Sequence, residues 1–413
     1  MPDVSFSGLL IVAAIAVAAP LLVGLVPRIR IPAVVLEIVA GIVVGPSVLG
    51  WVTVDLPIQV LALVGLAFLL FLAGLEIDLT QLRGRVARLA GIGFALTLVL
   101  AVAVGLGFGA VDWVKSPLLL AVALSGTSLG LVIPVLKDAG QIDEPLGRLT
   151  VASATIADFT AIVLLSLLFS EAEGGLESKL FAVGLFVAVI AAVGLTLFRA
   201  GRSMRLSETL VRLQDTTAEI RVRIAVLLMV AFVVLAEHVG LETILGAFIA
   251  GALLSALDRD AATHPNFRLK LEAVGYGFVI PVFFVASGLR FDLQALLESP
   301  SAFLRVPLFL AAILLVRAAP ALLYRSTVGP KASVAAGLLQ ATTLPLLVTA
   351  ADIGVTLGAI TPVTAAALIS AGLLSVLVFP LVALGLLREM PGDGGPGALR
   401  SPTWATTPRW WRG

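Results

Sequence analysis

The sequence predicts an all-α polytopic membrane protein with about thirteen transmembrane helices, built from two repeats of inverted topology. Its composition is the first observation, since 60% of its 413 residues are hydrophobic and 13% are charged, whereas a soluble domain is roughly 45–50% apolar and about 25% charged. The second observation is a series of apolar stretches long enough to cross a bilayer. The third is a set of short motifs that recur at a nearly constant offset.

Windows of about 19 residues on a hydropathy scale define thirteen candidate spans. They cover residues 6–26, 33–50, 57–76, 89–111, 117–136, 148–170, 179–199, 222–239, 241–257, 272–289, 301–324, 331–351 and 359–387. The first span has no basic segment before it and contains Pro20. We therefore interpret it as a membrane helix rather than a cleavable signal peptide.

The basic residues predict the orientation of the chain. Of the 27 Lys and Arg residues, 22 lie in the odd-numbered connections and the C-terminal tail, four lie in the even-numbered connections or the adjoining helix ends, and Arg317 lies inside the eleventh span. Basic residues concentrate on the cytoplasmic side of membrane proteins. This distribution predicts a multi-pass protein of the cell (plasma) membrane with its N-terminus outside and its C-terminus in the cytoplasm.

The spans divide the chain into four parts. Residues 1–200 hold the first repeat, spans one to six, together with the seventh span as a linker, and residues 201–221 form a cytoplasmic connection. Residues 222–387 hold the second repeat, spans eight to thirteen. Residues 388–413 are rich in Gly and Pro, and we expect this cytoplasmic tail to be disordered.

Three matched motifs indicate the repeat. Gly74–Leu79 recurs as Gly288–Leu293 after 214 residues, Thr127–Val132 recurs as Thr342–Leu347 after 215, and Asp138 recurs as Asp352 after 214, each Asp being followed two residues later by Gly. Seven spans, an odd number, separate the starts of the two copies, so the second copy is inverted in the membrane. Inverted repeats are typical of secondary transporters, in which the binding site lies near the midplane between the copies.

The fifth and twelfth spans are expected to be discontinuous. Thr127 and Ser128 lie in a small, polar stretch of the fifth span, and Gln340, Thr342 and Thr343 lie in the corresponding stretch of the twelfth. Such residues let a helix unwind, and the carbonyls that are freed can coordinate a cation. Small residues also serve ordinary close packing between helices, but their matched positions in two inverted copies favour a binding role.

Two charges lie within spans. Asp158 is near the middle of the sixth span, where an acid costs about 2.5–3.5 kcal/mol on insertion scales, so it is a candidate functional residue. Arg317 is about seven residues from the inner end of the eleventh span. It either snorkels to the interface or balances the midplane site, by pairing with Asp158 or by offsetting the C-terminal dipoles of broken helices.

The remaining polar residues exclude several classes of function. Cysteine is absent and only two histidines occur, so we expect no thiolate or His-rich metal site and no cofactor. An intramembrane aspartyl protease needs two facing carboxylates, and only Asp158 is placed at that depth; we expect no enzyme and no nucleic-acid partner. Glu37 is interpreted as part of an interfacial ion pair with Arg28 and Arg30. The residues interpreted as anchors at span ends are Glu76, Asp78, Arg290 and Asp292.

Several motifs together resemble a known family. They are Glu37–Pro46, Phe71–Asp78, Leu136–Gly140 with Gly147–Leu149, Gly246–Gly251 and Pro281–Val285. These runs are similar to those of the monovalent cation:proton antiporter superfamily, and most similar to the branch that contains glutathione-gated potassium efflux proteins and bacterial sodium/proton antiporters. The resemblance implies the sodium/proton antiporter fold, in which a mobile core domain carries two crossed, broken helices beside a dimerisation domain. It also implies a homodimer with elevator-like alternating access.

The resemblance also implies roles for single residues. Asp158 matches the essential carboxylate of the family, Arg317 matches its membrane-embedded basic residue, and Thr127 and Ser128 match the unwound part of the first broken helix. The sequence departs from many relatives at Ala157, where they carry Asn, Asp or Gln. It also lacks the Gly-Glu-Phe of potassium-efflux relatives at 342–344 and their nucleotide-binding domain, which puts glutathione or nucleotide gating in doubt.

The functional hypothesis is secondary active transport. Asp158 is expected to bind either a proton or one monovalent cation, Na⁺ or K⁺, with oxygen ligands from Thr127 and Ser128. Because Ala157 supplies no second titrating group, we expect electroneutral one-for-one exchange across the bilayer. A cation-coupled symporter on the same fold is the alternative.

Overall fold

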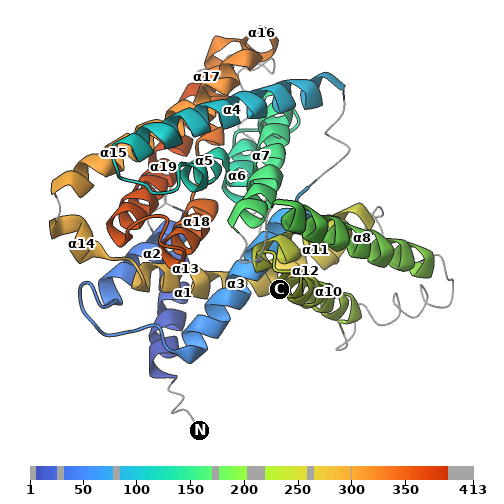
Figure 1. Cartoon of the computed structure of the whole chain (residues 1–413), viewed down its shortest axis with the longest axis horizontal. Helices are drawn as coiled ribbons and strands as arrows, with labels where there is room; N and C mark the ends of the chain where they lie inside the picture. Colours follow the sequence, from blue (N-terminus) through green and yellow to red (C-terminus); the bar gives the residue numbers. More distant parts are fainter. Residues whose placement is uncertain are drawn as a thin grey trace, which may run out of the picture.

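The computed structural model describes residues 6–25, 32–77, 84–169, 176–201, 219–257, 265–298 and 300–388, and every secondary-structure element in these ranges is helical (Figure 1). Before residue 202 the helices are α1 (Ser7–Leu25), α2 (Ala33–Val44), α3 (Leu56–Leu75), α4 (Gly84–Ala110), α5 (Pro117–Ser125), α6 (Leu129–Asp138), α7 (Pro145–Phe169) and α8 (Leu176–Gly201). From residue 219 on they are α10 (Ile220–His238), α11 (Thr243–Leu257), α12 (Pro265–Val274), the π-helix η1 (Gly275–Val279), α13 (Ile280–Leu289), α14 (Leu293–Glu298), α15 (Pro300–Ala318), the 3₁₀-helix η2 (Pro320–Tyr324), α16 (Arg325–Val328), α17 (Pro330–Gln340), α18 (Pro345–Thr356) and α19 (Pro362–Arg388).

Each of the thirteen predicted spans contains at least one of these helices, but their number as membrane crossings stays a prediction. Seven helices within the described ranges are long and apolar enough to cross a membrane, or eight if the bent pair α17 and α18 forms one crossing. Others, such as α2 and α11, are apolar but shorter. Most of the predicted cytoplasmic connection (202–218), the tail beyond Arg388, and Asp78 lie outside the described residues.

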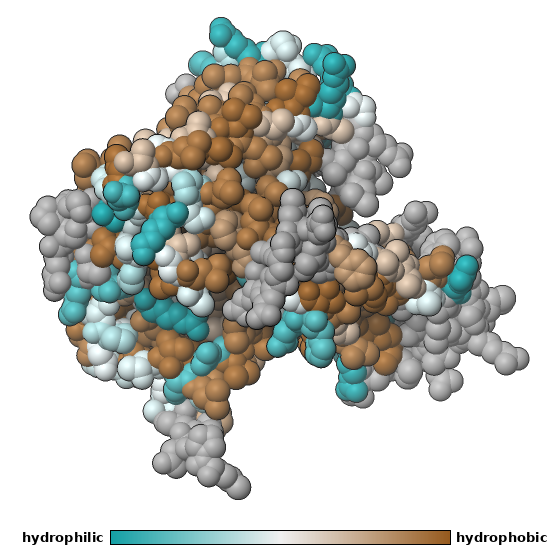
Figure 2. Space-filling model, in the orientation of Figure 1, coloured by the Kyte–Doolittle hydropathy of each residue, from teal (hydrophilic) through white to brown (hydrophobic). Residues whose placement is uncertain are grey.

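The helices pack in two groups. The first group consists of α1, α2, α3, α10, α11, α12 and α13, and the second consists of α4, α5, α6, α7, α15, α17, α18 and α19. Figure 1 shows the second group above the first, with α3 reaching the boundary between them. Hydrophobic residues cover much of the visible surface (Figure 2). Large apolar side chains are exposed on α4, for example Val99 and Leu106. This exposure fits a surface that faces lipid rather than water.

Two glycines hold α2 tightly against α13. A Cβ atom on Gly41 would lie 2.3 Å from the carbonyl oxygen of Val285, and one on Gly288 would lie 2.2 Å from that of Ile38. These separations are far below van der Waals contact, so the two backbones approach at a distance that only glycine permits. Small residues serve the same purpose in other membrane helix pairs.

The pair α3 and α11 repeats this contact. A Cβ atom on Gly251 would lie 2.0 Å from the carbonyl oxygen of Phe71, and one on Gly74 would lie 2.1 Å from that of Phe248. Gly74 of α3 corresponds to Gly288 of α13, and Phe71 corresponds to Val285, each at the repeat offset of 214 residues. The third helix of each copy therefore packs against the second helix of the other in the same way, which confirms the internal repeat.

The same helices show that the copies are inverted. Gly65 of α3 lies beside Val279 and Phe283, whereas Leu72, further along α3, lies beside Gly275. The chain directions of α3 and α13 are therefore opposite. Glu76, which follows α3, and Arg290, which follows α13, lie at opposite ends of this pair; we call these the Glu76 end and the Arg290 end.

The glycine contacts predict a selective loss of stability. Gly74→Ala should place a methyl group against the backbone of α11 and cost about 1–3 kcal/mol by overpacking. The expected result is a fall of several degrees in the melting temperature of the detergent-solubilised protein. Gly91→Ala is the matched control, because Gly91 lies in α4 with open space around its Cβ position. Equal melting temperatures for the two variants would contradict the packing argument.

Candidate functional site

The two broken helices meet at their interruptions. The α5 helix ends at Ser125 and α6 begins at Leu129, while α17 and α18 meet at a bend of 40°. The backbone N–H of Ser128 donates a hydrogen bond to the carbonyl oxygen of Thr342 at 3.0 Å. The hydroxyl of Thr127 donates to the backbone carbonyl oxygen of Gln340 at 2.8 Å. The unwound segments are thus tied to each other, which confirms that both spans are discontinuous.

The sequence explains where the helices break. At Gly126, which follows α5, a Cβ atom would lie 2.0 Å from a side-chain carbon of Leu346, so a larger residue there would have to displace the Leu346 side chain. Pro345 begins α18, at a position where its missing N–H leaves no helical hydrogen bond unmade. The hydroxyl of Ser375 in α19 accepts from the N–H of Thr343 at 3.2 Å and donates to its carbonyl at 2.9 Å. Backbone groups freed by the second break are thereby satisfied.

Asp158 lies on α7 opposite the first break and is 7% exposed. One carboxylate oxygen accepts the N–H of Thr127 at 2.8 Å, and the other accepts the N–H of Leu129 at 3.5 Å. The N–H of Leu129 is the first of α6 and that of Thr127 lies just before its N-cap, Ser128. The unpaired donors and the dipole at a helix start favour a negative charge. The break in the fifth span therefore supplies part of the stabilisation that an ionised Asp158 needs inside the membrane.

Arg317 is 1% exposed, so it does not snorkel to the interface. Its Nε donates to the carbonyl oxygen of Gln340 at 3.2 Å, and its terminal nitrogens donate to the hydroxyls of Thr127 and, at 3.5 Å, Thr97. Gln340 is the last residue of α17, where the helix dipole favours a cation. In the part of the chain that the structure describes, no ion pair within 4 Å joins Arg317 to Asp158. The two charges are linked through Thr127 instead.

A cavity of about 50 Å³ lies beside Asp158. Thr127 and Ser128 line it, as the sequence analysis expected of residues near the site, and so do Glu76 and Tyr276 from the other helix group. The predicted residues of the second break, Gln340, Thr342 and Thr343, do not line this cavity. Gln340 and Thr342 instead make the contacts that tie the two breaks together, and the backbone of Thr343 bonds to Ser375 of α19.

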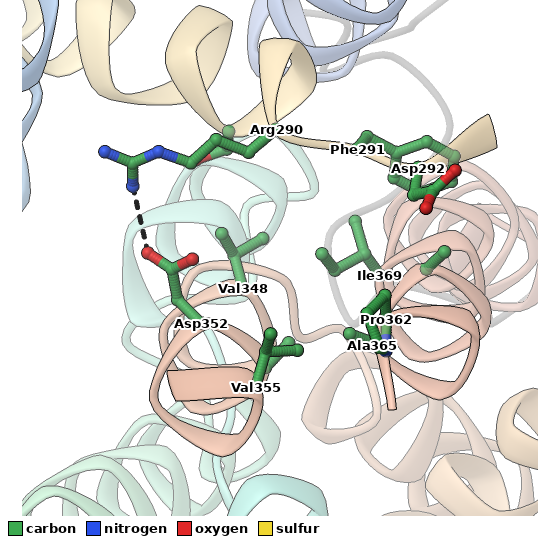
Figure 3. A pocket seen from close by; sticks show the side chains of 12 residues that line it. Arg290, Phe291, Asp292, Val348, Asp352, Val355, Pro362, Ala365 and Ile369 are labelled. Carbon is green, nitrogen blue, oxygen red and sulfur yellow. Dashed lines mark hydrogen bonds and ion pairs between the residues drawn. The ribbon is translucent and has the colours of Figure 1, made fainter. Parts of the chain in front are cut away.

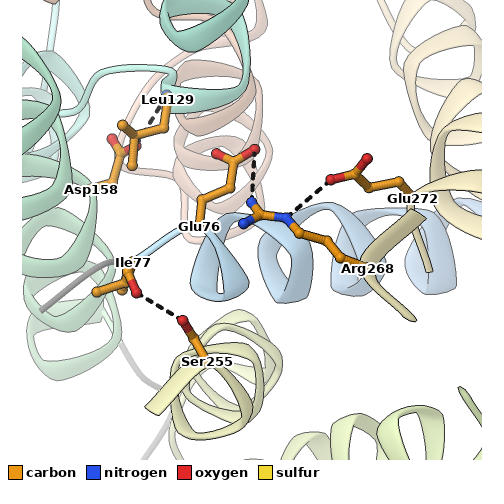
Figure 4. Close-up of polar contacts among 7 residues, drawn as sticks. All are labelled: Glu76, Ile77, Leu129, Asp158, Ser255, Arg268 and Glu272. Carbon is orange, nitrogen blue, oxygen red and sulfur yellow. Dashed lines mark hydrogen bonds and ion pairs between the residues drawn. The ribbon is translucent and has the colours of Figure 1, made fainter. Parts of the chain in front are cut away.

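Glu76 differs from its interpretation as an anchor at a span end. It directly follows α3, but its side chain is only 13% exposed and points into the space between the two helix groups (Figure 4). Oε1 is 3.9 Å from a guanidinium nitrogen of Arg268, and Oε2 is buried without a hydrogen-bond partner. Hydropathy located the end of α3 correctly, but it gives no information about the depth of the recess between the groups.

Tyr276 was also missed by the sequence analysis. It lies in the π-helix η1, just before Pro281. Because Pro281 has no N–H, one backbone hydrogen bond of the preceding turn is missing. Single π-helical turns of this kind are frequent at functional sites. The tyrosine hydroxyl would lie 3.3 Å from a Cβ atom on Gly130, in the first turn of α6. The Gly-Tyr-Gly that precedes Pro281 was the available signal.

Glu37 is a further buried acid, at 5% exposure in α2. Its predicted partners Arg28 and Arg30 lie outside the described residues. Glu37 and Asp158 are thus both buried, while the predicted ion pair of Glu37 stays a prediction.

The family of this chain follows from a comparison with known proteins. The profile of the family described as "Sodium/hydrogen exchanger, transmembrane" matches residues 13–388. The chain belongs to this family. The family consists of membrane transporters rather than enzymes, so the resemblance stated from the motifs is confirmed.

Similar proteins include other members of the sodium/hydrogen exchanger family. The chain is 30% identical over 398 residues to the putative Na⁺/H⁺ antiporter YjbQ of Bacillus subtilis, covering 92% of this chain and 63% of YjbQ. It is 28% identical over 281 residues to a Na⁺/H⁺ antiporter of Enterococcus hirae, covering 66% of this chain and 70% of that one. The chain thus spans less than two thirds of the length of YjbQ.

A solved structure with the same fold is that of the sodium proton antiporter MjNhaP1 from Methanocaldococcus jannaschii. The TM-score is 0.60 with 19% sequence identity, and the match covers 92% of this chain and 97% of that chain. The agreement confirms the predicted fold class, an all-α membrane protein with the sodium/proton antiporter fold.

The geometry of the exchanger site predicts different effects for two substitutions at Thr127. Thr127→Val should leave a buried N–H of Arg317 without its partner and remove one of the two hydrogen bonds to the carbonyl of Gln340, at a cost of about 1–3 kcal/mol. The melting temperature of the purified protein should fall accordingly. Thr127→Ser keeps the hydroxyl and should remain close to the wild type. Similar melting temperatures for the Val and Ser variants would show that this hydroxyl does not tie the two breaks together.

Proposed function

We propose that this chain exchanges a monovalent cation, Na⁺ or K⁺, for protons across the membrane, with Asp158 as the group that binds either ion. The observation that carries the proposal is the position of Asp158, which is buried at the meeting point of two broken helices and lines a cavity. Its relatives are named Na⁺/H⁺ antiporters, which favours exchange over the symport alternative.

The exchange follows from the cost of a buried charge. A bare Asp158 carboxylate is expensive to carry through a low-dielectric barrier, whereas a protonated or cation-bound one is not. The loaded site would therefore move and the empty anion would stay. Since a proton and a cation compete for the same oxygens, the two ions cross in opposite directions.

The ligands proposed for the cation are oxygens, as hard alkali ions prefer. Asp158 supplies its carboxylate and Ser128, which lines the same cavity, supplies its hydroxyl. The hydroxyl of Thr127 already donates to Gln340 and accepts from Arg317. We therefore assign Thr127 mainly to orientation, with one lone pair left for the ion.

Arg317 is proposed to balance charge without joining the exchange. Arginine keeps its proton under physiological conditions, and here it is held against the end of α17. Glu76 shares the cavity with Asp158, but Arg268 lies beside it. With Asp158 as the only group that exchanges its proton, the stoichiometry is one to one and electroneutral.

The arrangement in the cell is part of the proposal. The basic residues support a plasma-membrane protein with its C-terminus in the cytoplasm, which places the Glu76 end on the cytoplasmic side. A homodimer is proposed from the family resemblance. The group with the broken helices would be the moving core, and residues 1–200 and 222–387 would be the two inverted repeats.

Asp158→Asn is the decisive variant. It removes the charge that binds the cation but preserves the shape of the side chain, so exchange should fall to the background of empty liposomes. The measurement is dequenching of a pH-sensitive dye in proteoliposomes after addition of Na⁺, K⁺ or Li⁺. An unchanged elution profile and melting temperature would show that the variant is folded. Exchange at more than a few per cent of the wild-type rate would refute the role of Asp158.

The stoichiometry gives a separate prediction. If one cation is exchanged for one proton, the initial rate of ²²Na⁺ uptake under a K⁺ gradient should be the same with valinomycin, which imposes a membrane potential, as without it. A protonophore added alongside the potential tests for proton leak. Uptake that follows the potential would mean that a second proton moves, and Glu76→Gln would then show whether Glu76 carries it.

A further inference from the structure

An ion pair joins the two helix groups at the Arg290 end. Arg290 directly follows α13 in the first group, and Asp352 lies in α18 of the second. A guanidinium nitrogen of Arg290 is 3.0 Å from a carboxylate oxygen of Asp352 (Figure 3). A cavity of about 100 Å³ lies next to the pair, between α13, α18 and α19. The contact thus bridges the two parts that alternating access would move against each other.

The repeat relates this pair to charges at the other end. Arg290 and Glu76 are 214 residues apart in the matched motifs, and so are Asp352 and Asp138. Lys137 is adjacent to Asp138 in the last turn of α6. The first copy therefore has an acid after α3 and a base at the end of α6, and the second copy has a base after α13 and an acid in α18. The charge that follows the third helix is thus reversed between the copies, whereas Asp352 is matched by another acid, Asp138, and the base Lys137 precedes Asp138 by one residue.

At the Glu76 end, the corresponding contact is open. Glu76 faces Arg268, which also binds Glu272 at 3.1 Å, so this arginine is shared within the first group (Figure 4). Oε2 of Glu76 is buried without a hydrogen-bond partner. In the described ranges, no ion pair within 4 Å involves Lys137. The cavity at Asp158 extends to this open end.

We propose that these two contacts alternate: Arg290–Asp352 closes the Arg290 end in the state described here, and Glu76–Lys137 closes the Glu76 end in the opposite state. The inference rests on the proposed function, because it assumes that the group with the broken helices moves during transport. The inverted repeat supplies its logic, since exchanging the conformations of the two copies converts one state into the other. Glu76 then gains a partner for its second oxygen when the cavity closes.

The exposure of the Arg290–Asp352 pair sets the size of its effect. The two side chains are 33% and 56% exposed, and ion pairs of this kind shift an equilibrium by up to about fivefold. Such a contact biases the populations of the two states without blocking their exchange. Transport requires that it break in every cycle, so it must be weak.

A cross-link tests whether the pair must separate. The chain contains no cysteine, so Arg290→Cys with Asp352→Cys introduces only the intended two. Oxidation should join them and reduce exchange in proteoliposomes at least tenfold, and reduction should restore it. The control is Ile77→Cys with Ser255→Cys, a pair that lies in contact within one helix group; its cross-link should leave exchange unchanged. Full exchange by the cross-linked Arg290/Asp352 protein would overturn the proposal.

Labelling tests the alternation without transport. Val355 lines the cavity beside the pair, and Val355→Cys in nanodiscs reports the opening of that end to a charged maleimide. Arg290→Ala and Asp352→Ala should each raise the labelling rate about two- to fivefold, and the exchanged pair Arg290→Asp with Asp352→Arg should restore it. Lys137→Ala should lower the rate, because it destabilises the opposite state. Unchanged labelling rates would refute the alternation. So would a rate that rises in Lys137→Ala as it does in Arg290→Ala and Asp352→Ala.

The two proposals fail in different ways. Labelling does not depend on ion exchange, so it can be repeated in the Asp158→Asn background. If the labelling changes as expected but Asp158→Asn still exchanges ions, the assignment of Asp158 is wrong and the alternating contacts stand. If Asp158→Asn is inactive but labelling is unaffected by the ion-pair variants, the reverse holds.

Discussion

The rest of this structure depends on two buried charges, Asp158 and Arg317, each of which binds the end of a broken helix. Asp158 accepts N–H groups at the start of α6, and Arg317 donates to the carbonyl at the end of α17. Each charge satisfies backbone groups that the membrane would otherwise leave without partners. Thr127 bonds to both charged residues and to Gln340. The two breaks are therefore hydrogen-bonded to each other at the point where these two charges lie.

The inverted repeat makes this meeting possible. Two copies that run in opposite directions bring the start of α6 and the end of α17 to the same point, where Thr127 bonds to Gln340. The glycine contacts of Gly41 and Gly251 build the same helix pair twice, so the first group is assembled from equivalent halves. The repeat also carries charges of opposite sign at Glu76 and Arg290, at the two ends of the recess between the groups. Symmetry in the backbone is thus combined with a reversal of charge.

The part of the site contributed by the first helix group was the hardest to foresee. Glu76 and Tyr276 reach the cavity from α3 and η1, which are far in sequence from Asp158. Hydropathy treats the end of a span as the membrane surface, but here the surface is recessed between two groups of helices. Glu76 therefore lies near Asp158 although it follows the last residue of α3.

The sequence by itself determined the fold class, the repeat and the two breaks, and it singled out Asp158 and Arg317 as the charges within spans. These depend on local composition, on hydropathy and on the cost of a charge in lipid, all of which can be read along the chain. Only the tertiary structure decided that Arg317 binds Gln340 and Thr127 instead of Asp158, and that Glu76 shares the cavity. Those outcomes depend on how helices from distant parts of the chain cross, and a hydrogen-bond partner is chosen by that geometry rather than by residue type.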